Sequence, residues 1–197
     1  MRKLIIATKN KGKVDEIKEL LAKSDFEILS LLDAGIDSDI EENGKSFEEN
    51  SLIKALAIHK LTGCIVLADD SGLEIDFLNQ APGIYTARFL GDHAKDKERY
   101  YGVLKLLEGI SEEYRKARFV CAVSLVSDKK KMTARGTLEG EIAYHAAGFN
   151  GFGYDPIFWV PDYQKTLAEL DQETKNKISH RGKAFMAIAE QLKTIEI

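Results

Sequence analysis

The chain has 197 residues, enough for one substantial domain or two small lobes that share a core, and its 44% hydrophobic and 30% charged residues are ordinary for a soluble globular protein. The formal net charge of −4 argues against broad electrostatic binding to a nucleic-acid polymer, and no apolar run approaches the roughly 20 residues that cross a bilayer. The two cysteines, Cys64 and Cys121, lie in apolar runs and predict reduced, buried thiols. The amino terminus is too short in its apolar part for a signal peptide, so we expect a cytoplasmic protein without membrane attachment.

The first predicted elements are a strand, a basic loop and a helix. Leu4 to Ala7 has the pattern of a short buried strand, and an amphipathic helix with Val14 and Ile17 on its apolar face follows. The residues between them are Thr8, Lys9, Asn10, Lys11, Gly12 and Lys13. Because the first N–H groups of a helix carry partial positive charge, this arrangement predicts an anion site, and the alternative is a solvated basic loop. The glycine spacing is not that of a P-loop.

An acidic run and a second helix come next, after a predicted strand over 26–31. The acids are Asp33, Asp37, Asp39, Glu41 and Glu42, which form a solvated loop or lend one carboxylate to a cation held mainly by Asp70. Ser46 and Glu49 form a capping-box signature for a helix. We expect its buried stripe at Leu52, Ile53, Leu56, Ala57 and Leu61. Lys54, four residues after Asn50 on one helix face, is either exposed or directed at a phosphate.

Two adjacent acids follow the apolar run Cys64 to Ala68, which reads as a buried strand. We expect Asp69, Asp70, Ser71 and Gly72 to form a turn at its carboxyl end, where ligands bind in open α/β sheets. The pair predicts a metal or acid/base site, and the alternative is an Asp-rich turn that only caps the strand.

The remaining segments complete a mixed sheet with helices around it. We expect strands over 73–77, 84–90 and 157–160, a hairpin of strands over 117–127 and 132–143, a helix over 92–108 with Tyr101, Leu104 and Leu107 inward, a short helix capped by Thr166, and a closing helix through Met186, Ile188, Ala189 and Leu192.

Two late segments offer groups for a flat ligand. Phe149, Phe152 and Tyr154 alternate with glycines before Asp155, which predicts a stacking platform for a base or rings tucked into the core. Hydrogen-bond donors of three kinds gather further on, at Lys175, His180 and Arg181. They suit purine carbonyl or phosphate oxygens, and a solvated cluster at a helix start is the alternative.

Six motifs in this order resemble the inosine/xanthosine triphosphate pyrophosphatase family, which removes non-standard purine nucleotides. They are Thr8-x-Asn10-x-x-Lys13, Ser46-Phe47-x-Glu49-Asn50 with Lys54, Ala68-Asp69-Asp70-Ser71-Gly72-Leu73, Ala81-Pro82-Gly83-Ile84-Tyr85-x-Ala87-Arg88, Gly151-Phe152-Gly153-Tyr154-Asp155-Pro156, and Lys175 with Ser179-His180-Arg181. The resemblance implies one domain over 1–197, an elongated α/β fold of two lobes with a long central mixed sheet flanked by helices, and an active site in the cleft between the lobes. It also implies a homodimer and Mg²⁺-dependent hydrolysis of ITP, dITP or XTP to the monophosphate and pyrophosphate.

The resemblance also implies roles for individual residues. Glu41 and Asp70 would hold Mg²⁺, and Asp70 would also accept a proton. Triphosphate contacts would come from Thr8, Lys9, Asn10, Lys11, Gly12, Lys13, Lys54 and Ser71. Base contacts would come from Phe152, Gly153, Tyr154, Asp155, Lys175, His180 and Arg181.

The residues themselves suggest how such a site would work. We hypothesise that Asp69 and Asp70 share the orientation of an attacking water, while a cation and lysines take the developing charge. Donors aimed at the 6-carbonyl of hypoxanthine or xanthine would reject adenine. Two alternatives are a septum-inhibitor-type pyrophosphatase acting on dTTP or UTP, and a nucleotide sensor without turnover.

Overall fold

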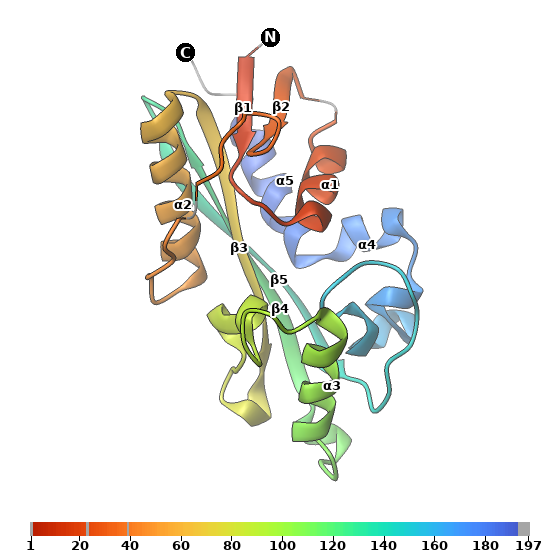
Figure 1. Ribbon diagram of the computed structural model, residues 1–197. Helices are drawn as coiled ribbons and strands as arrows, with labels where there is room; N and C mark the ends of the chain where they lie inside the picture. Colours follow the sequence, from red (N-terminus) through yellow and green to blue (C-terminus); the bar gives the residue numbers. More distant parts are fainter. Residues whose placement is uncertain (1, 23, 39, 193–197) are drawn as a thin grey trace. The chain divides into compact units, whose positions relative to one another are not determined.

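The computed structural model describes residues 2–22, 24–38 and 40–192. Over these residues seven strands form one sheet in the order β2-β1-β3-β4-β5-β6-β7 (Figure 1). The sheet is mixed, because β1 runs parallel to β2 and β3 whereas β6 runs antiparallel to β5 and β7. This confirms the predicted class, an α/β fold with a mixed sheet flanked by helices.

The elements follow the predicted order along the chain. The strands are β1 (Arg2–Ile6), β2 (Phe26–Ser30), β3 (Ile65–Ile75), β4 (Lys116–Val126), β5 (Lys131–Ile142), β6 (Phe158–Val160) and β7 (Lys165–Thr166). The α-helices are α1 (Lys11–Leu20), α2 (Phe47–Thr62), α3 (Asp96–Leu106), α4 (Gln172–Ile178) and α5 (His180–Leu192). β4 and β5 are neighbours joined by a short turn, as the hairpin prediction requires.

The chain divides into two compact units. Unit 1 takes its residues from Met1–Asp70, Cys121–Gly136 and His180–Ile197, and unit 2 from Ser71–Val120 and Thr137–Ser179. Strands β3, β4 and β5 contribute residues to both units. The expectation of one domain with a site between two lobes stays a prediction.

In unit 1, helices cover both faces of the sheet. Leu4 and Ile6 of β1 pack into an apolar cluster with α1 and α5, whereas Ile5 and Ala7 pack into a second cluster with α2. Figure 1 shows α2 on one side of β1 and β3, and α1 and α5 on the other. Because successive side chains of a strand point to opposite faces, each residue of these strands is assigned to one helical layer. Both faces are apolar, as is usual for parallel strands covered on both sides.

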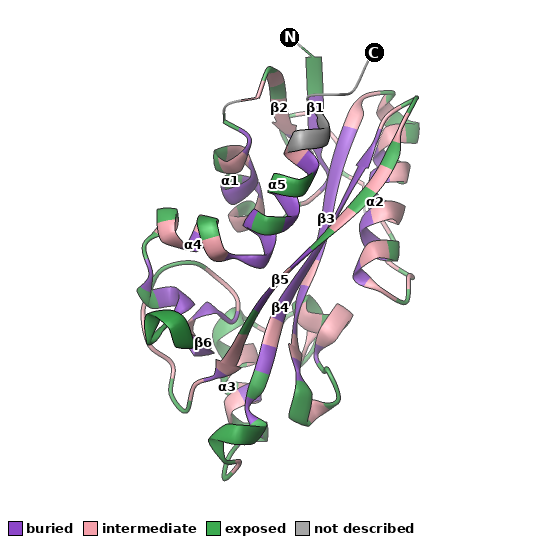
Figure 2. Cartoon of the chain, turned by 180° about the vertical axis from the view of Figure 1, so that it is seen from behind, coloured by how far each residue is buried: buried purple, intermediate pink, exposed green. Residues whose placement is uncertain are grey.

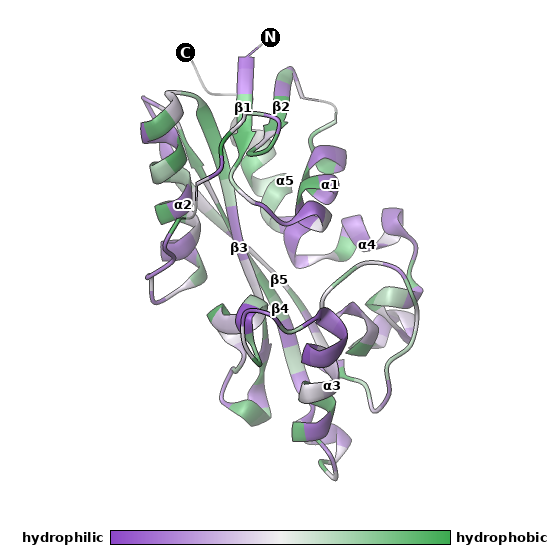
Figure 3. Ribbon diagram, in the orientation of Figure 1, coloured by the Kyte–Doolittle hydropathy of each residue, from purple (hydrophilic) through white to green (hydrophobic). Residues whose placement is uncertain are grey.

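The predicted turn after Ala68 is wrong. β3 continues without interruption from Ile65 to Ile75, so Asp69 and Asp70 lie inside a strand that is buried over most of its length (Figure 2). Along it the residues change from hydrophobic to hydrophilic at the two acids (Figure 3). A carboxylate is tolerated in a buried strand where donors or cations meet it, and local pattern cannot show such partners.

The predicted buried stripe of α2 is only partly correct, because Leu52 and Leu56 are half-buried against an apolar cluster but Ala57 is exposed. Its buried residues are Phe47, Asn50, Ser51, Lys54, Ala55 and Ile58. They are spaced by three and four residues, so they form one helical face, while Leu61 is 64% exposed. The capping box is present in a modified form: Ser46 accepts from the backbone N–H of Glu49, but the Glu49 carboxylate accepts from Lys45.

Unit 2 has its own apolar core, which includes Leu73, Val103, Tyr154 and Phe158. Two predictions here need correction. Residues 84–90 form no strand, because Gly83–Arg88 is a 3₁₀ helix. Tyr101 of α3 is exposed, and Val103 takes the inward position beside Leu107.

Candidate functional site

The two adjacent aspartates of β3 face different helical layers of unit 1. The Asp70 side chain contacts residues of α2, and the Asp69 side chain contacts residues of α1 and α5. This follows from strand geometry, since neighbouring side chains point to opposite faces. The two carboxylates therefore have separate surroundings despite their adjacency in sequence.

On the α2 face, Asp70 lies among polar groups that the folded chain has gathered. Asn50 donates from Nδ2 to Asp70 Oδ2 at 3.1 Å, and Lys54 Nζ lies 3.8 Å from Asp70 Oδ1. Lys54 Nζ also donates to Glu42 Oε2 at 3.0 Å. Burial raises the pKa of Asp70, and the charge of Glu42 adds to this rise against the opposing effect of Lys54 and Lys13. Asp70 is therefore the more readily protonated of the two acids.

On the opposite face, Asp69 is a buried carboxylate matched by cations. Lys13 Nζ lies 2.9 Å from Asp69 Oδ2, and Arg181 Nε lies 3.6 Å from the same oxygen. Burial alone would raise the pKa of Asp69, but Lys13, Arg181 and Lys54 outweigh it and hold that pKa well below its usual range. Arg181 also pairs with Glu16 of α1, and all three side chains of this Glu16–Arg181–Asp69 chain are buried.

The fold brings Arg181 to this place through a close contact between β5 and α5. A Cβ on Gly136 would overlap the backbone of His180 and Ala184, so only glycine lets the first turn of α5 lie against the strand. His180 and Arg181 are both buried there. Cys121 of β4 lies in the apolar cluster that contains Ala184 of α5. Burial, with the charge of Asp69, raises the pKa of its thiol to about 12.

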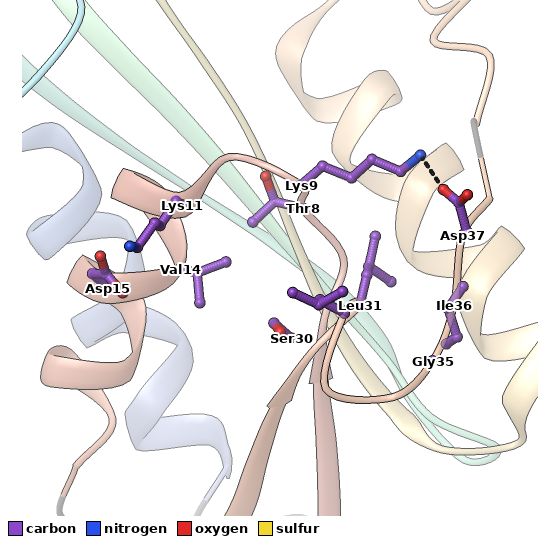
Figure 4. A pocket seen from close by; sticks show the side chains of 11 residues that line it. Thr8, Lys9, Lys11, Val14, Asp15, Ser30, Leu31, Gly35, Ile36 and Asp37 are labelled. Atoms are coloured by element: carbon purple, nitrogen blue, oxygen red, sulfur yellow. Dashed lines mark hydrogen bonds and ion pairs between the residues drawn. The ribbon is translucent and has the colours of Figure 1, made fainter.

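The predicted basic loop is shorter than expected, because α1 begins at Lys11 and includes Gly12 and Lys13. Asn10 is the N-cap, and its Oδ1 accepts from the backbone N–H of Lys13 at 3.2 Å. A cavity of about 770 Å³ lies between this region and the segment after β2, with Thr8, Lys9 and Lys11 in its lining. Figure 4 shows Lys9 extended to Asp37, and their charged atoms are 2.9 Å apart.

Unit 2 holds a second buried ion pair. Lys175 Nζ of α4 lies 2.8 Å from Asp155 Oδ2, which also accepts from the backbone N–H of Phe152 at 2.9 Å. The Lys175 ammonium lies 5.0 Å from the centre of the Phe152 ring, a cation–π distance. Gly151 has a φ of +76°, and a Cβ there would overlap Asp155. The glycine-rich loop thus fixes one ring over one buried ammonium.

The other aromatic residues of this loop differ in environment. Tyr154 packs in the core of unit 2 and its hydroxyl donates to the Thr86 carbonyl at 3.0 Å, whereas Phe149 is fully exposed. The backbone N–H of Gly153 donates to Asp96 at 2.9 Å. Of the three rings, Phe152 is the half-buried one, so it is the ring best placed to stack on a ligand.

The predicted site residues fall into two groups. Thr8 through Lys13, Lys54, Asp69, Asp70, His180 and Arg181 belong to unit 1, and Ser71, Phe152 through Asp155 and Lys175 belong to unit 2. Among the acidic run, Glu41 is exposed and Glu42 is the residue that reaches Lys54, while Asp39 lies outside the described residues. The ligand roles inferred from the family resemblance stay predictions.

Glu16 was not predicted from sequence, Glu42 was named only as one member of the acidic run, and Asn50 was named only in a motif beside Lys54. Glu42 stands beside Glu41 in an acidic run, and nothing in the pattern separates the two. Asn50 carried a usable signal, because a polar residue four positions before Lys54 lies on the same helix face. Glu16 is an acid within an amphipathic helix, and its buried cation comes from the far end of the chain.

Known proteins resemble the whole chain. A dITP/XTP pyrophosphatase of Clostridium perfringens is 48% identical over 202 residues, covering 99% of both chains. A protein of the same name from Bacillus licheniformis is 47% identical and covers 98% of both. A solved HAM1 protein from Coxiella burnetii superimposes with a TM-score of 0.89 at 42% identity, covering 99% of this chain and all of that one.

A search of the described residues finds no helix long and apolar enough to cross a membrane. The model of the Ham1 family matches residues 4–191. This match and the full-length relatives bear out the resemblance drawn from the six motifs. The chain belongs to the Ham1 family.

Proposed function

We propose that this protein hydrolyses the triphosphates of non-standard purines, namely ITP, dITP and XTP, to the monophosphate and pyrophosphate. The observation that carries the proposal is the buried Asp70 carboxylate, held by Asn50 with Lys54 and Glu42 beside it. Such a group can accept a proton from water while a neighbouring lysine binds phosphate oxygens. The substrate class is supported by relatives at 48% and 47% identity that are named dITP/XTP pyrophosphatases.

In the proposed reaction, water attacks the α-phosphorus and the bond to the pyrophosphate group breaks. Asp70 takes the proton of the water, because its buried carboxylate is held by Asn50 with Lys54 beside it. Lys54 and Lys13 lie near Asp70 and stabilise the negative charge that develops on the phosphate oxygens. Asp69 takes no direct part, since its buried carboxylate is engaged by Lys13 and Arg181 on the other face. Its role is to hold these two cations.

The site fits Mg²⁺ as a cofactor. The described residues contain no group of three His, Cys, Asp or Glu side chains that could hold a metal. Mg²⁺ does not need such a group, because it binds through one or two carboxylates together with substrate phosphates and waters. Asp70 and Glu42, which both lie beside Lys54, would supply these carboxylates, with Glu41 the neighbouring candidate. When bound, the ion would neutralise triphosphate charge.

Recognition of the base is proposed for unit 2. Phe152 would stack on the purine, and Lys175 would donate to a carbonyl oxygen. The Lys175 ammonium carries three N–H donors. Adenine has an amino group where hypoxanthine and xanthine have a carbonyl, so it would leave these donors unpaired, and this can reduce its turnover by about 10⁴-fold.

We also propose that the protein acts in the cytoplasm as a homodimer. Both cysteines are free, which is consistent with a reducing compartment. The homodimer is what the family resemblance implies. Light scattering coupled to size exclusion would show a single species of twice the chain mass, and a monomer would contradict the proposal.

A substrate panel tests the activity. Pyrophosphate release would be measured for ITP, dITP, XTP, GTP, ATP, dTTP and UTP, each with and without Mg²⁺. We expect the first three to be turned over fastest and only with the metal present. ATP as the best substrate would overturn the base selectivity, dTTP or UTP would favour the septum-inhibitor type, and an absence of turnover would indicate a sensor.

A further inference from the structure

We propose that Asn50 is a positioning residue for the reaction. Its side-chain NH₂ group donates a hydrogen bond to the Asp70 carboxylate. Its side-chain oxygen accepts one from the backbone of the segment that carries Glu42. The inference rests on the proposed function, because it concerns the geometry of the proposed base. Every group that it uses belongs to unit 1.

The Asn50 amide uses both of its ends. Nδ2 donates to Asp70 Oδ2 at 3.1 Å, and Oδ1 accepts from the backbone N–H of Gly44 at 2.9 Å. A flipped amide would place its carbonyl oxygen against the carboxylate and its NH₂ group against an N–H, and both contacts would be repulsive. The surroundings therefore fix the orientation of the amide, which is fully buried.

Gly44 is required for this contact. A Cβ at this position would lie 2.7 Å from Asn50 Oδ1 and 2.7 Å from Glu49 Cβ, closer than real Cβ atoms approach such neighbours. The close approach brings the end of the acidic run onto α2, two residues after Glu42. Glu42 in turn reaches Lys54 Nζ at 3.0 Å.

Asp70 is thus held by two residues one turn apart on the same helix. Asn50 contacts Oδ2, and Lys54 lies on the side of Oδ1. The lysine supplies charge, and the amide supplies direction without changing the charge of the site. A carboxylate that is hydrogen-bonded at Oδ2 and has an ammonium beside Oδ1 presents its remaining lone pairs in one orientation, which a base or a metal ligand needs.

The test compares Asn50→Leu with Ser51→Ala. Leucine keeps the branched shape of the Asn50 side chain, although it is larger, and it makes neither hydrogen bond. Ser51 is the matched control, because it is equally buried on the same face of α2 and its hydroxyl bonds to Ser124 rather than to Asp70. We expect Asn50→Leu to lower kcat for ITP by about 10- to 100-fold with KM changed less than about threefold. We expect Ser51→Ala to keep kcat within about twofold.

Two further measurements support the test. The first does not depend on turnover, and the second does not depend on whether Asn50→Leu folds. Binding of Mn²⁺ alone, followed by electron paramagnetic resonance, should weaken by about tenfold in Asn50→Leu and stay unchanged in Ser51→Ala. Gly44→Ala leaves Asn50 in place but displaces its partner, and it should reproduce a part of the loss in kcat. If Asn50→Leu does not fold, Gly44→Ala and Asn50→Ser carry the same test.

The outcomes separate this inference from the proposed function. Wild-type protein without ITP turnover would overturn the function and this inference with it. An active wild type would overturn only the positioning role if Asn50→Leu keeps kcat and Mn²⁺ affinity, or if Ser51→Ala loses as much of both as Asn50→Leu does. A rise in KM alone would also overturn it, since it would assign Asn50 to substrate binding.

Discussion

The surroundings on the two faces of β3 shift the pKa of an aspartate in opposite directions. On the α1 and α5 face, Asp69 is met by Lys13 and Arg181, and these cations hold its pKa well below the usual range. On the α2 face, Asp70 is met by a neutral amide, a more distant lysine and a second acid, and burial raises its pKa. The first carboxylate is stabilised in its charged form, whereas the second is not.

The difference teaches that adjacency in sequence does not imply a shared role. Asp69 contributes to the fold, because its charge is needed to balance buried cations. Asp70 costs stability in its ionised form, and such strained groups are typical of sites that do chemistry. The hypothesis that both acids orient one water stays untested, and the separate surroundings of the two acids favour different roles for them.

The largest expected effect is the loss of turnover in Asp70→Asn. Asparagine has nearly the same shape but cannot accept the proton, so kcat for ITP should fall by about 10³-fold. The free energy of unfolding in urea should stay the same or rise, because a buried carboxylate with a raised pKa is replaced by a neutral amide. Turnover near that of the wild type would remove Asp70 from the mechanism.

Asp69→Asn should show the reverse pattern, with the larger change in stability. It leaves Lys13 without its buried counter-charge and Arg181 with Glu16 as its buried partner, which should cost about 3 kcal/mol of unfolding free energy at pH 7. The pKa of Asp69 is lower in the folded than in the unfolded chain, so its contribution is present above pH ~4 and is lost as the pH falls further. Urea titrations of both proteins from pH 7 to pH 3 should show their difference shrinking. A constant difference would contradict the charge argument.

Lys13→Met should have an intermediate effect, because it should lower the stability of the protein and also weaken substrate binding. It removes the 2.9 Å partner of Asp69, but Arg181 remains, so the loss of stability should be smaller than in Asp69→Asn. It also removes a proposed phosphate contact, which should raise KM for ITP roughly tenfold. Lys18→Met is the control for stability, because Lys18 pairs with Asp33 at the surface and should contribute less than about 1 kcal/mol. Equal losses in the two variants would contradict the assignment.

The smallest expected effect concerns Cys121, on the face of Asp69. Its thiol is fully buried with a pKa of about 12, so iodoacetamide at pH 8 should not modify it in the folded protein. Cys64 is half-buried and serves as the internal reference, since it should react faster. Mass spectrometry of labelled peptides would distinguish the two sites. Rapid labelling of Cys121 would show that this face opens in solution.

Much of the fold could be predicted from the sequence, because its signals are local. The alternation of strands and helices, the Ser46 cap and the apolar face of α1 depend on residues within a few positions of one another. The same local rules failed at β3, where Asp69 and Asp70 look like turn residues but lie inside a strand. Their partners come from α1, α2 and α5, so no window around residue 69 contains them.

The site was predicted in composition but not in arrangement. The motifs include Lys13, Lys54, Asp69, Asp70 and Arg181, yet no spacing rule places Arg181 next to Asp69, 112 positions earlier. The buried face of α2 was missed for a related reason. Hydrophobic periodicity assumes that polar residues face solvent, whereas Asn50, Ser51 and Lys54 face inward because distant residues satisfy them.

The alternation of side chains along β3 also limits the insertions and deletions that this strand can accept. Inserting or deleting one codon in the strand ahead of Asp69 would exchange the two aspartates between the helical layers, so Asp70 would face the side of the two buried cations and Asp69 the side of the Asn50 amide. Every residue that follows in the strand would be inverted at the same time. Length changes in this family should therefore accumulate in the loops before Ile65 and after Ile75, and a relative with an odd-length change inside the strand should have lost both its stability and its turnover.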